Sequence, residues 1–266
     1  MKQYLFLPQW VCMMAIVIFS LCSCWPSSVG TDPYIVNQNR QKENVYYIPS
    51  SPNTSLLSEK NDLSLDVKRS SGSNYSGTDA QASYLPGKHI GITGSYSHAD
   101  NESIIKRNRF ELGSGYITQL KKGWHFETYA GFGKGKILNE HYTGSSRTNL
   151  THLFLQPAFA ISNKNKTVQF GVVSRFEGVN FKVTDTLFNN DREPFSAEQV
   201  RSLYDQPFHI MWQPGFVFRV GWKNFLFHTS YSASSDLTNP DLHVRKDNFS
   251  LGVSFRFNTA EKGIKK

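Results

Sequence analysis

One stretch of this chain restricts its fold more than any other. Within residues 248–257, five apolar side chains alternate with small or polar ones: Phe249, Leu251, Val253, Phe255 and Phe257. The side chains of an extended strand point alternately to opposite faces, so this spacing predicts a strand with one apolar and one polar face. The apolar face must therefore contact either the core of a soluble β-sandwich or the lipid around a transmembrane barrel.

Similar alternation recurs in nine further segments, which favours the barrel. We expect these strands at residues 62–69, 78–85, 88–98, 107–120, 124–136, 149–162, 167–182, 208–222 and 225–233. Most are long enough for a tilted strand to cross a membrane, which takes about 9–11 residues. The first two are the weakest, so eight strands are the alternative to ten. The sequence thus predicts an all-β, antiparallel transmembrane β-barrel over residues 62–258.

The expected connections alternate in length, as they do in outer-membrane barrels with short periplasmic turns and long outer loops. The short connections are residues 86–87, 121–123, 163–166 and 223–224. The long ones are 70–77, 99–106, 137–148, 183–207 and 234–247. Within 183–207, Ser196 and Gln199 form a capping-box pair that predicts a short helix. With an even strand count, both barrel termini are expected to be periplasmic, and residues 259–266 form a polar periplasmic tail.

The last expected strand ends on an aromatic residue, and in this it resembles the closing strand of bacterial outer-membrane barrels. That resemblance implies an assembly signal, read by the barrel-assembly machinery during insertion and made of the apolar residues Phe249, Leu251, Val253, Phe255 and Phe257. Aromatic residues also gather at the boundaries of membrane barrels, and those expected beside the short turns are Trp124, Trp222, Phe225 and Phe257.

The N-terminal residues have the features of a lipoprotein leader. An apolar run over residues 11–21 follows Lys2 and is too short to span a membrane as a helix, so residues 1–23 are predicted to be a signal peptide. The sequence Leu-Cys-Ser-Cys at residues 21–24 fits a lipobox, with acylation of Cys24. Cys24 would then be a lone exported cysteine without a disulfide partner, which lipidation explains. An ordinary signal peptide with an incidental cysteine is the alternative.

Residues 24–61 lack a sustained strand or helix period and contain several prolines, so we expect a lipidated, extended tether. From Tyr47 to Asp62 the chain resembles the segment before the barrel in uncharacterised outer-membrane β-barrel lipoproteins of Bacteroidota, a family with no assigned activity. Surface-exported lipoproteins of that phylum carry acidic residues just after the lipidated cysteine, whereas Trp-Pro-Ser-Ser follows Cys24. The resemblance therefore implies a lipid anchor in the inner leaflet.

If the apolar faces point outward, the opposite faces line a narrow lumen. This lumen receives a polar network of both signs, made of Asp66, Asp79, Glu127, Arg175, Glu177, Arg219 and Arg256, together with Lys68, Gln81, Glu111, His152, Gln156, Gln169, Gln213 and His228. An unpaired charge in a space of low dielectric is unfavourable, so we expect these groups to pair across the lumen as a cross-braced plug. A solute path or a polar active site is the alternative.

Three histidine–carboxylate neighbours lie in or beside the expected outer loops and are candidates for a rim-site enzyme: His98 with Asp100, His141 with Glu140, and His243 with Asp241. Such catalysis needs a base next to a nucleophile or an activated water. The sequence lacks a metal-binding cysteine or HExxH spacing, a phosphate loop and a Gly-x-Ser-x-Gly elbow. Neither a metal nor a cofactor is therefore expected, and no catalytic residue is assigned.

Basic residues outnumber acidic ones by 29 to 21, which in other contexts indicates nucleic acid binding. The export signal argues against that class, and lysines at the inner turns suit anionic lipid head groups instead. The sequence favours a lipid-anchored barrel that is a non-enzymatic structural or interaction component of the cell envelope. Its expected partners are outer-membrane lipids, the barrel-assembly machinery and another envelope protein. A rim-site enzyme acting on lipid or peptide and a narrow solute channel are the alternatives.

Overall fold

The structure is a computed structural model that describes residues 45–52, 54–72, 75–101, 105–120, 123–141, 144–188, 194–222, 224–239, 242 and 244–259. The expected signal peptide, the lipobox with Cys24 and the first part of the tether lie outside the described residues. The same is true of Asp241, His243 and the tail after Thr259.

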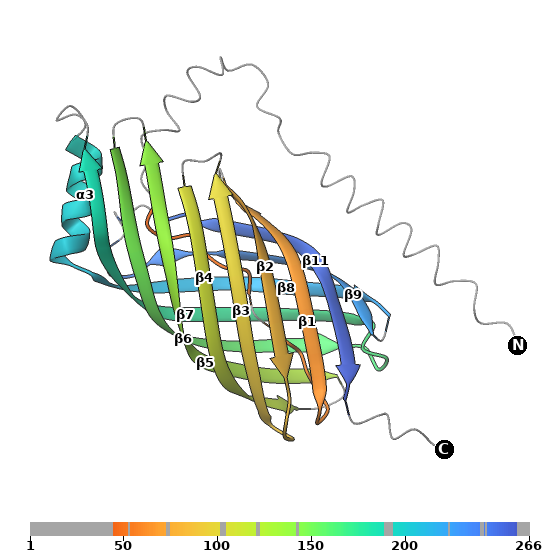
Figure 1. Ribbon diagram of the computed structural model, residues 1–266. Coiled ribbons are helices and arrows are strands. Elements are labelled where there is room, and N and C mark those ends of the chain that lie inside the picture. Colours follow the sequence, from red (N-terminus) through yellow and green to blue (C-terminus); the bar gives the residue numbers. More distant parts are fainter. Residues whose placement is uncertain are drawn as a thin grey trace, which may run out of the picture. The chain divides into compact units, whose positions relative to one another are not determined.

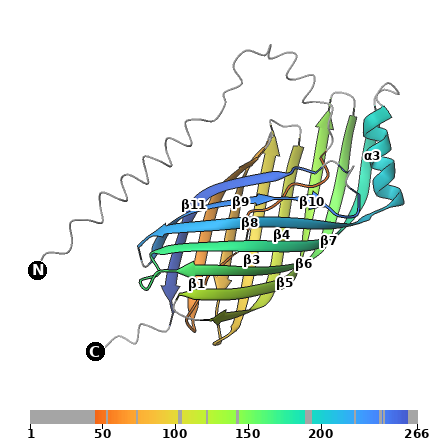
Figure 2. The same cartoon turned by 180° about the vertical axis from the view of Figure 1, so that it is seen from behind.

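Ten antiparallel strands form a closed barrel (Figures 1 and 2). They are β1 (Asp62–Gly72), β2 (Tyr75–Tyr84), β3 (Ile90–Asn101), β4 (Ile105–Gln119), β5 (Trp124–His141), β6 (Gly144–Ser162), β7 (Val168–Phe188), β8 (Phe208–Gly221), β9 (Phe225–Ala233) and β11 (Asp247–Asn258). Neighbours in sequence pair with one another, and pairing of β11 with β1 closes the sheet. The two-residue β10 (Ser235–Asp236) pairs with β8 beyond the part that β9 covers. The expectation of ten barrel strands rather than eight is confirmed.

The two ends of the barrel differ, and we name them by their connections. At the turn end, short links join β2 to β3, β4 to β5, β6 to β7 and β8 to β9, and here β1 begins and β11 ends. At the α3 end, helix α3 (Pro194–Asp205) joins β7 to β8, and residues 234–246 with β10 join β9 to β11 (Figure 1). The helix expected within residues 183–207 is therefore present. Both ends of the barrel wall, Asp62 and Asn258, lie at the turn end.

The expectation of long loops is wrong at 70–77, 99–106 and 137–148, which are largely strand. In the third of these, β5 runs to His141 and β6 begins at Gly144, so that the two strands stay paired to their tips. We name the paired ends of β5 and β6, from Lys134 and Thr151 to their tips, the overhang. Its exposed outward side chains are polar, namely Lys134, Lys136, Glu140, Arg147 and Thr151, and only the partly exposed Leu138 among the described ones is apolar. The apolar alternation stops there while the backbone pairing continues. A hydrophobicity pattern does not detect a strand whose outer face is polar.

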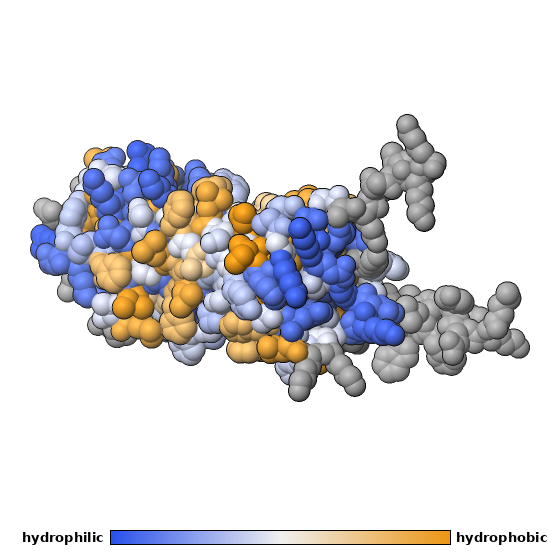
Figure 3. Space-filling view, turned by 90° about the horizontal axis from the view of Figure 1, so that it is seen from below, coloured by the Kyte–Doolittle hydropathy of each residue, from blue (hydrophilic) through white to orange (hydrophobic). Residues whose placement is uncertain are grey.

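The outer surface of the barrel is apolar below this overhang and down to the turn end. The exposed large hydrophobic side chains range from 37% to 68% exposure, with Leu153 at 68%, Trp222 at 60% and Ile90 at 55%. Figure 3 shows hydrophobic residues gathered mainly across the middle of one face, with hydrophilic residues toward both ends. Contiguous apolar surface of this extent marks an interaction with lipid or with another protein. In the described part of the chain, no helix is long and apolar enough to cross a membrane.

Candidate functional site in the barrel lumen

The lumen is occupied by the part of the chain that precedes β1. We name residues 45–57 the lumen segment, and each of its described residues is buried. Tyr46, Ile48 and Leu57 are at most 1% exposed. The segment runs as a thin orange coil inside the ring of strands (Figures 1 and 2). The second half of the expected tether is thus extended, and it fills the barrel.

At the α3 end, the wall holds the lumen segment through its backbone. The Val45 N–H donates to Asn139 Oδ1 at 3.0 Å, and Asn139 Nδ2 donates to the Val45 carbonyl at 3.2 Å. Arg107 donates to the carbonyl of Ile48. Asn139 lies two residues before the end of β5, and Arg107 lies two residues after the start of β4, so both bonds form close to this end.

The same kind of contact continues down the barrel. In its middle, the Ser51 hydroxyl donates to Asp79, and Lys68 Nζ donates to the Pro52 carbonyl at 3.1 Å. These bonds come from β2 and β1, which lie side by side in the wall. The lumen segment therefore has partners on the wall at this depth as well as at the α3 end.

Toward the turn end, three charged side chains form hydrogen bonds with the backbone of the last part of the lumen segment. Glu127 accepts hydrogen bonds from the backbone N–H groups of Ser55 and Leu56 at 3.2 and 3.0 Å. Arg219 and Arg256 each donate to the Ser55 carbonyl, at 3.1 and 3.0 Å. The lumen segment consequently runs from the α3 end at Val45 to the turn end at Leu57, from where residues 58–61 lead into β1.

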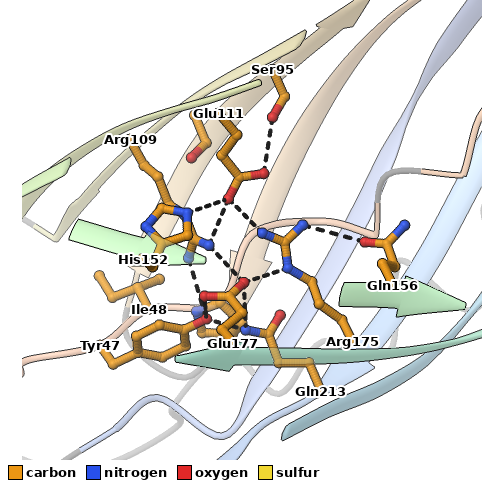
Figure 4. Close-up of polar contacts among 12 residues, drawn as sticks. Tyr47, Ile48, Ser95, Arg109, Glu111, His152, Gln156, Arg175, Glu177 and Gln213 are labelled. Carbon is orange, nitrogen blue, oxygen red and sulfur yellow. Dashed lines mark hydrogen bonds and ion pairs between the residues drawn. The ribbon is translucent and has the colours of Figure 1, made fainter. Parts of the chain in front are cut away.

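Four charged side chains form a network across the middle of the lumen (Figure 4). Arg109 Nη2 lies 2.5 Å from Glu111 Oε1 and 2.6 Å from Glu177 Oε1. Arg175 contacts the same two carboxylates, with Nη2 at 2.6 Å from Glu111. The Tyr47 hydroxyl donates to Glu177 at 2.9 Å and so joins the lumen segment to the network. Two cations thus balance two anions, and the loss of any one would leave a buried charge unpaired.

Apolar clusters lie at both ends of these polar layers. At the α3 end, Val200 and Leu203 of α3 belong to a buried cluster with Val45, Tyr46, Ile48, Ile105, Ile137, Leu150, Val179 and Phe181. Toward the turn end, a second cluster consists of Leu57, Leu85, Ile117, Tyr129 and Phe154. Within the described residues, the inside of the barrel is therefore a packed core with charged layers between apolar ones.

The predicted lumen residues lie as follows. Asp66, Asp79, Glu127, Arg175, Glu177 and Arg219 are buried in the lumen, and Arg256 is partly buried there. Of the other polar residues expected inside, Glu111 pairs with Arg175 in the central network, and His152 Nε2 lies 3.1 Å from Glu111 Oε1. Asp66 and Arg219 form an ion pair, with 3.4 Å between Asp66 Oδ1 and Arg219 Nη2.

The lumen residues that were not predicted include Arg107, Arg109 and Asn139, and the position of the lumen segment inside the barrel was not predicted either. Arg107 and Arg109 have the same parity in β4 as Glu111, so strand alternation alone would have identified them. Asn139 was not predicted to face the lumen because residues 137–148 were expected to form a loop, whereas Asn139 lies in β5. The lumen segment has neither a strand nor a helix period. Its sequence therefore does not indicate that the barrel wall surrounds it.

The expected signal residues of the closing strand lie in β11. Phe255 and Phe257 are 40% and 46% exposed on the outside of the barrel, and Phe249, Leu251 and Val253 are partly exposed. Inward-facing Ser250 and Ser254 alternate with them and are buried. Cys24, the predicted lipidation site, lies outside the described residues.

In the described part of the chain, the rim candidates His98 and Glu140 have the following partners. His98 Nδ1 lies 2.7 Å from Asn108 Oδ1, and Glu140 pairs with Lys106 at 3.7 Å. The side chain of His141 and the pair of His243 and Asp241 lie outside the described residues.

A histidine–carboxylate pair that the sequence did not indicate joins His209 of β8 to Asp236 of β10. His209 Nδ1 lies 2.6 Å from Asp236 Oδ2, and Nε2 lies 2.8 Å from the Gln206 carbonyl oxygen. Both ring nitrogens are engaged and the side chain is buried, so no nitrogen is available as a general base. The pair ties the connection after β9 to the wall.

No protein-family model matches this chain, and no curated protein is similar to it. Solved structures that resemble it include the N-terminal β-barrel domain of Pseudomonas aeruginosa OprF, at 12% identity and a TM-score of 0.39, covering 74% of this chain and 98% of that one. The translocator domain of the autotransporter NalP from Neisseria meningitidis has 10% identity and a TM-score of 0.45, covering 76% and 90%. The attachment invasion locus protein Ail of Yersinia pestis has 13% identity and a TM-score of 0.30, covering 75% and 100%. The assignment of a closed ten-stranded barrel rests on the strand pairing itself.

Proposed function

We propose that this chain is a lipid-anchored outer-membrane β-barrel with a closed lumen, and that it acts as a non-enzymatic structural or interaction component of the cell envelope. The observation that carries the proposal is the lumen segment, which the wall binds from Val45 to Leu56. A barrel filled by its own chain leaves no open lumen for solute passage. Its outer surface and its two ends are then the parts available to partners.

The distribution of side chains on the outer wall supports the membrane location. Exposed aromatic residues such as Trp124 and Trp222 lie at the turn end, whereas the overhang of β5 and β6 at the α3 end is polar. Transmembrane barrels have an apolar band with aromatic residues at its boundaries, short periplasmic turns and larger outer connections. In that arrangement the turn end is periplasmic and the α3 end faces outward. Each large apolar side chain placed in lipid contributes roughly 1.5–3 kcal/mol.

The proposed partners follow from the same surfaces. The apolar band contacts outer-membrane lipids, and the exposed aromatic end of β11 is the candidate signal for the barrel-assembly machinery. Acylation of Cys24 would add a second membrane contact. The polar overhang and the connection with α3 form the outer rim, which is the surface that another envelope protein would meet.

Conductance of the purified full chain in planar bilayers tests the closed lumen. We expect no steady conductance steps from the intact protein. The matched variant lacks residues 45–57 and is used only after heat-modifiable gel mobility shows that its barrel has folded; it should conduct. Steady steps from the intact protein would overturn the closed lumen and favour a solute channel. A folded protein that fails to float with lipid vesicles would overturn the membrane location.

A further inference from the structure

Within the residues that the structure describes, the chain crosses the barrel eleven times, ten times as a wall strand and once as the lumen segment. Ten antiparallel strands return the chain to the end where it began, so Asp62 and Asn258 share the turn end. The lumen segment adds an odd crossing. Val45 therefore lies at the α3 end of the barrel, whereas Asn258 lies at the turn end. The chain enters the lumen at one end of the barrel and leaves the wall at the other.

Independent contacts fix the direction at the α3 end. Tyr47 forms a β-bridge with Val244, and the Arg245 N–H donates to the Tyr47 carbonyl at 2.9 Å. Both partners belong to the connection between β9 and β11 at the α3 end. Val45 and Tyr46 also share the buried cluster with α3.

The contacts at the turn end are equally specific. Glu127 lies three residues after the start of β5, and it binds Ser55 and Leu56. The Asn61 N–H donates to the Leu85 carbonyl at 2.7 Å, beside the link from β2 to β3. A lumen segment of reversed direction would lose all of these bonds, so its direction is determined at both ends.

We propose that residues 24–44 lie on the outer face of the membrane, so that the acylated Cys24 is presented at the cell surface. This inference rests on the proposed function, which assigns the α3 end to the outside. The sequence alone favours an inner-leaflet anchor, and the path of the lumen segment argues for the opposite side. The arm from Cys24 to residue 44 has 21 residues and spans at most about 70 Å when extended, enough to reach the surrounding outer leaflet from the barrel mouth.

A return of this arm to the periplasmic side is blocked by the packing of the lumen. A second pass beside the lumen segment would displace the charged network around Glu177 and the apolar cluster around Phe181, both of which are buried. A pass through the lipid would bring the charged side chains of Arg40, Lys42 and Glu43 into the hydrocarbon region, which is strongly unfavourable. The arm is therefore placed outside when β1 and β11 close the wall around the lumen segment.

Labelling of single cysteines in intact cells tests this topology. Three variants of the full chain are compared: Asn37→Cys in the arm, Asp185→Cys near the end of β7 at the α3 end, and Lys164→Cys in the link from β6 to β7 at the turn end. Asp185 and Lys164 are both exposed. A membrane-impermeant maleimide is applied before and after permeabilisation of the outer membrane, and the unsubstituted chain measures any background from Cys24.

We expect Asn37→Cys and Asp185→Cys to label in intact cells to the same extent as after permeabilisation, and Lys164→Cys to label only after it. Protection of Asn37→Cys in intact cells, with Asp185→Cys labelled, would overturn the surface arm and leave the proposed function standing. Labelling of Lys164→Cys with protection of Asp185→Cys would mean an inverted barrel, which also overturns the inference. Equal labelling of Asp185→Cys and Lys164→Cys in intact cells would overturn the membrane-spanning barrel itself.

Discussion

The Asn139 side chain pairs with Val45 through the two hydrogen bonds that a neighbouring strand would otherwise provide. The Val45 N–H donates to Oδ1 at 3.0 Å, and Nδ2 donates to the Val45 carbonyl at 3.2 Å, across 94 residues of sequence. Asn139 is 0% and Val45 2% exposed, so water does not replace these bonds when they are lost. This one amide binds the start of the lumen segment to the overhang of β5 at the α3 end.

Replacement of Asn139 by leucine should release the lumen segment at the α3 end. Two buried backbone groups of Val45 lose their partner, at about 1–3 kcal/mol each. Even at the lower figure, the two groups together raise the open population about thirtyfold. Chymotrypsin cleavage after Tyr46 or Tyr47 in the folded, detergent-solubilised protein should increase accordingly. Asn180→Leu is the matched control because Asn180 lies exposed on β7, and equal cleavage of the two variants would contradict the role of Asn139.

The central charge network should be far more sensitive to neutralisation than a surface pair. Glu177 contacts Arg109, Arg175 and Tyr47, so Glu177→Gln leaves two buried guanidinium groups with one remaining carboxylate. We expect a loss of about 3–5 kcal/mol of unfolding free energy. Glu140→Gln, which removes the half-exposed pair with Lys106, should lose at most about 1 kcal/mol. The two variants are compared by the urea concentration at which half of the protein loses its heat-modifiable mobility. Similar midpoints for Glu177→Gln and Glu140→Gln would mean that the network adds little stability.

Phe257→Ala tests the assembly signal of β11. Loss of the ring removes roughly 1.5–3 kcal/mol of burial against lipid from the finished barrel. If the insertion machinery recognises Phe257 before the barrel forms, the amount of inserted protein should fall by more than this loss of stability alone would cause. The measurement is the amount of heat-modifiable protein in outer-membrane fractions. Phe225→Ala is an unsuitable control, because the ring centroid of Phe225 lies 5.2 Å from that of Phe255 in β11.

Phe132→Ala is the better match to Phe257→Ala. Phe132 lies on β5, away from the closing strand, and is 52% exposed, compared with 46% for Phe257. It should insert nearly normally, while Phe257→Ala accumulates unfolded or degraded protein in the periplasm. Equal insertion of the two variants would show that the closing strand carries no special signal.

Cys24 is expected to carry a diacylglyceryl-type group, joined to its sulfur in a thioether. Mass spectrometry of the N-terminal peptide of the mature protein detects this mass, and an unmodified N-terminus at another residue would exclude lipidation. The Cys24→Ser variant should still fractionate with the outer membrane, because the apolar wall holds the protein there independently of the acyl chains. A folded Cys24→Ser protein in the soluble fraction would mean that the wall does not contact lipid.

The amino-acid sequence by itself determined the barrel wall. Alternation over segments such as 124–136 and 225–233 predicted the ten strands, because the period of two is set by residues adjacent in the chain. The same alternation predicted which charges point inward, and Asp66, Glu127 and Glu177 lie there. It failed at the overhang of β5 and β6, where pairing of backbone groups continues without an apolar face.

Only the tertiary structure decided what fills the barrel and in which direction. Arg219 and Ser55 are 164 residues apart, and Glu177 and Tyr47 are 130 apart, yet each pair is hydrogen-bonded. Closure of the wall brings such groups together, and no local period encodes it. The lumen segment has few backbone partners of its own, so its conformation depends on side chains from most strands of the wall. Its direction follows from the positions of those side chains along the barrel, because each buried donor and acceptor needs a partner at its own depth.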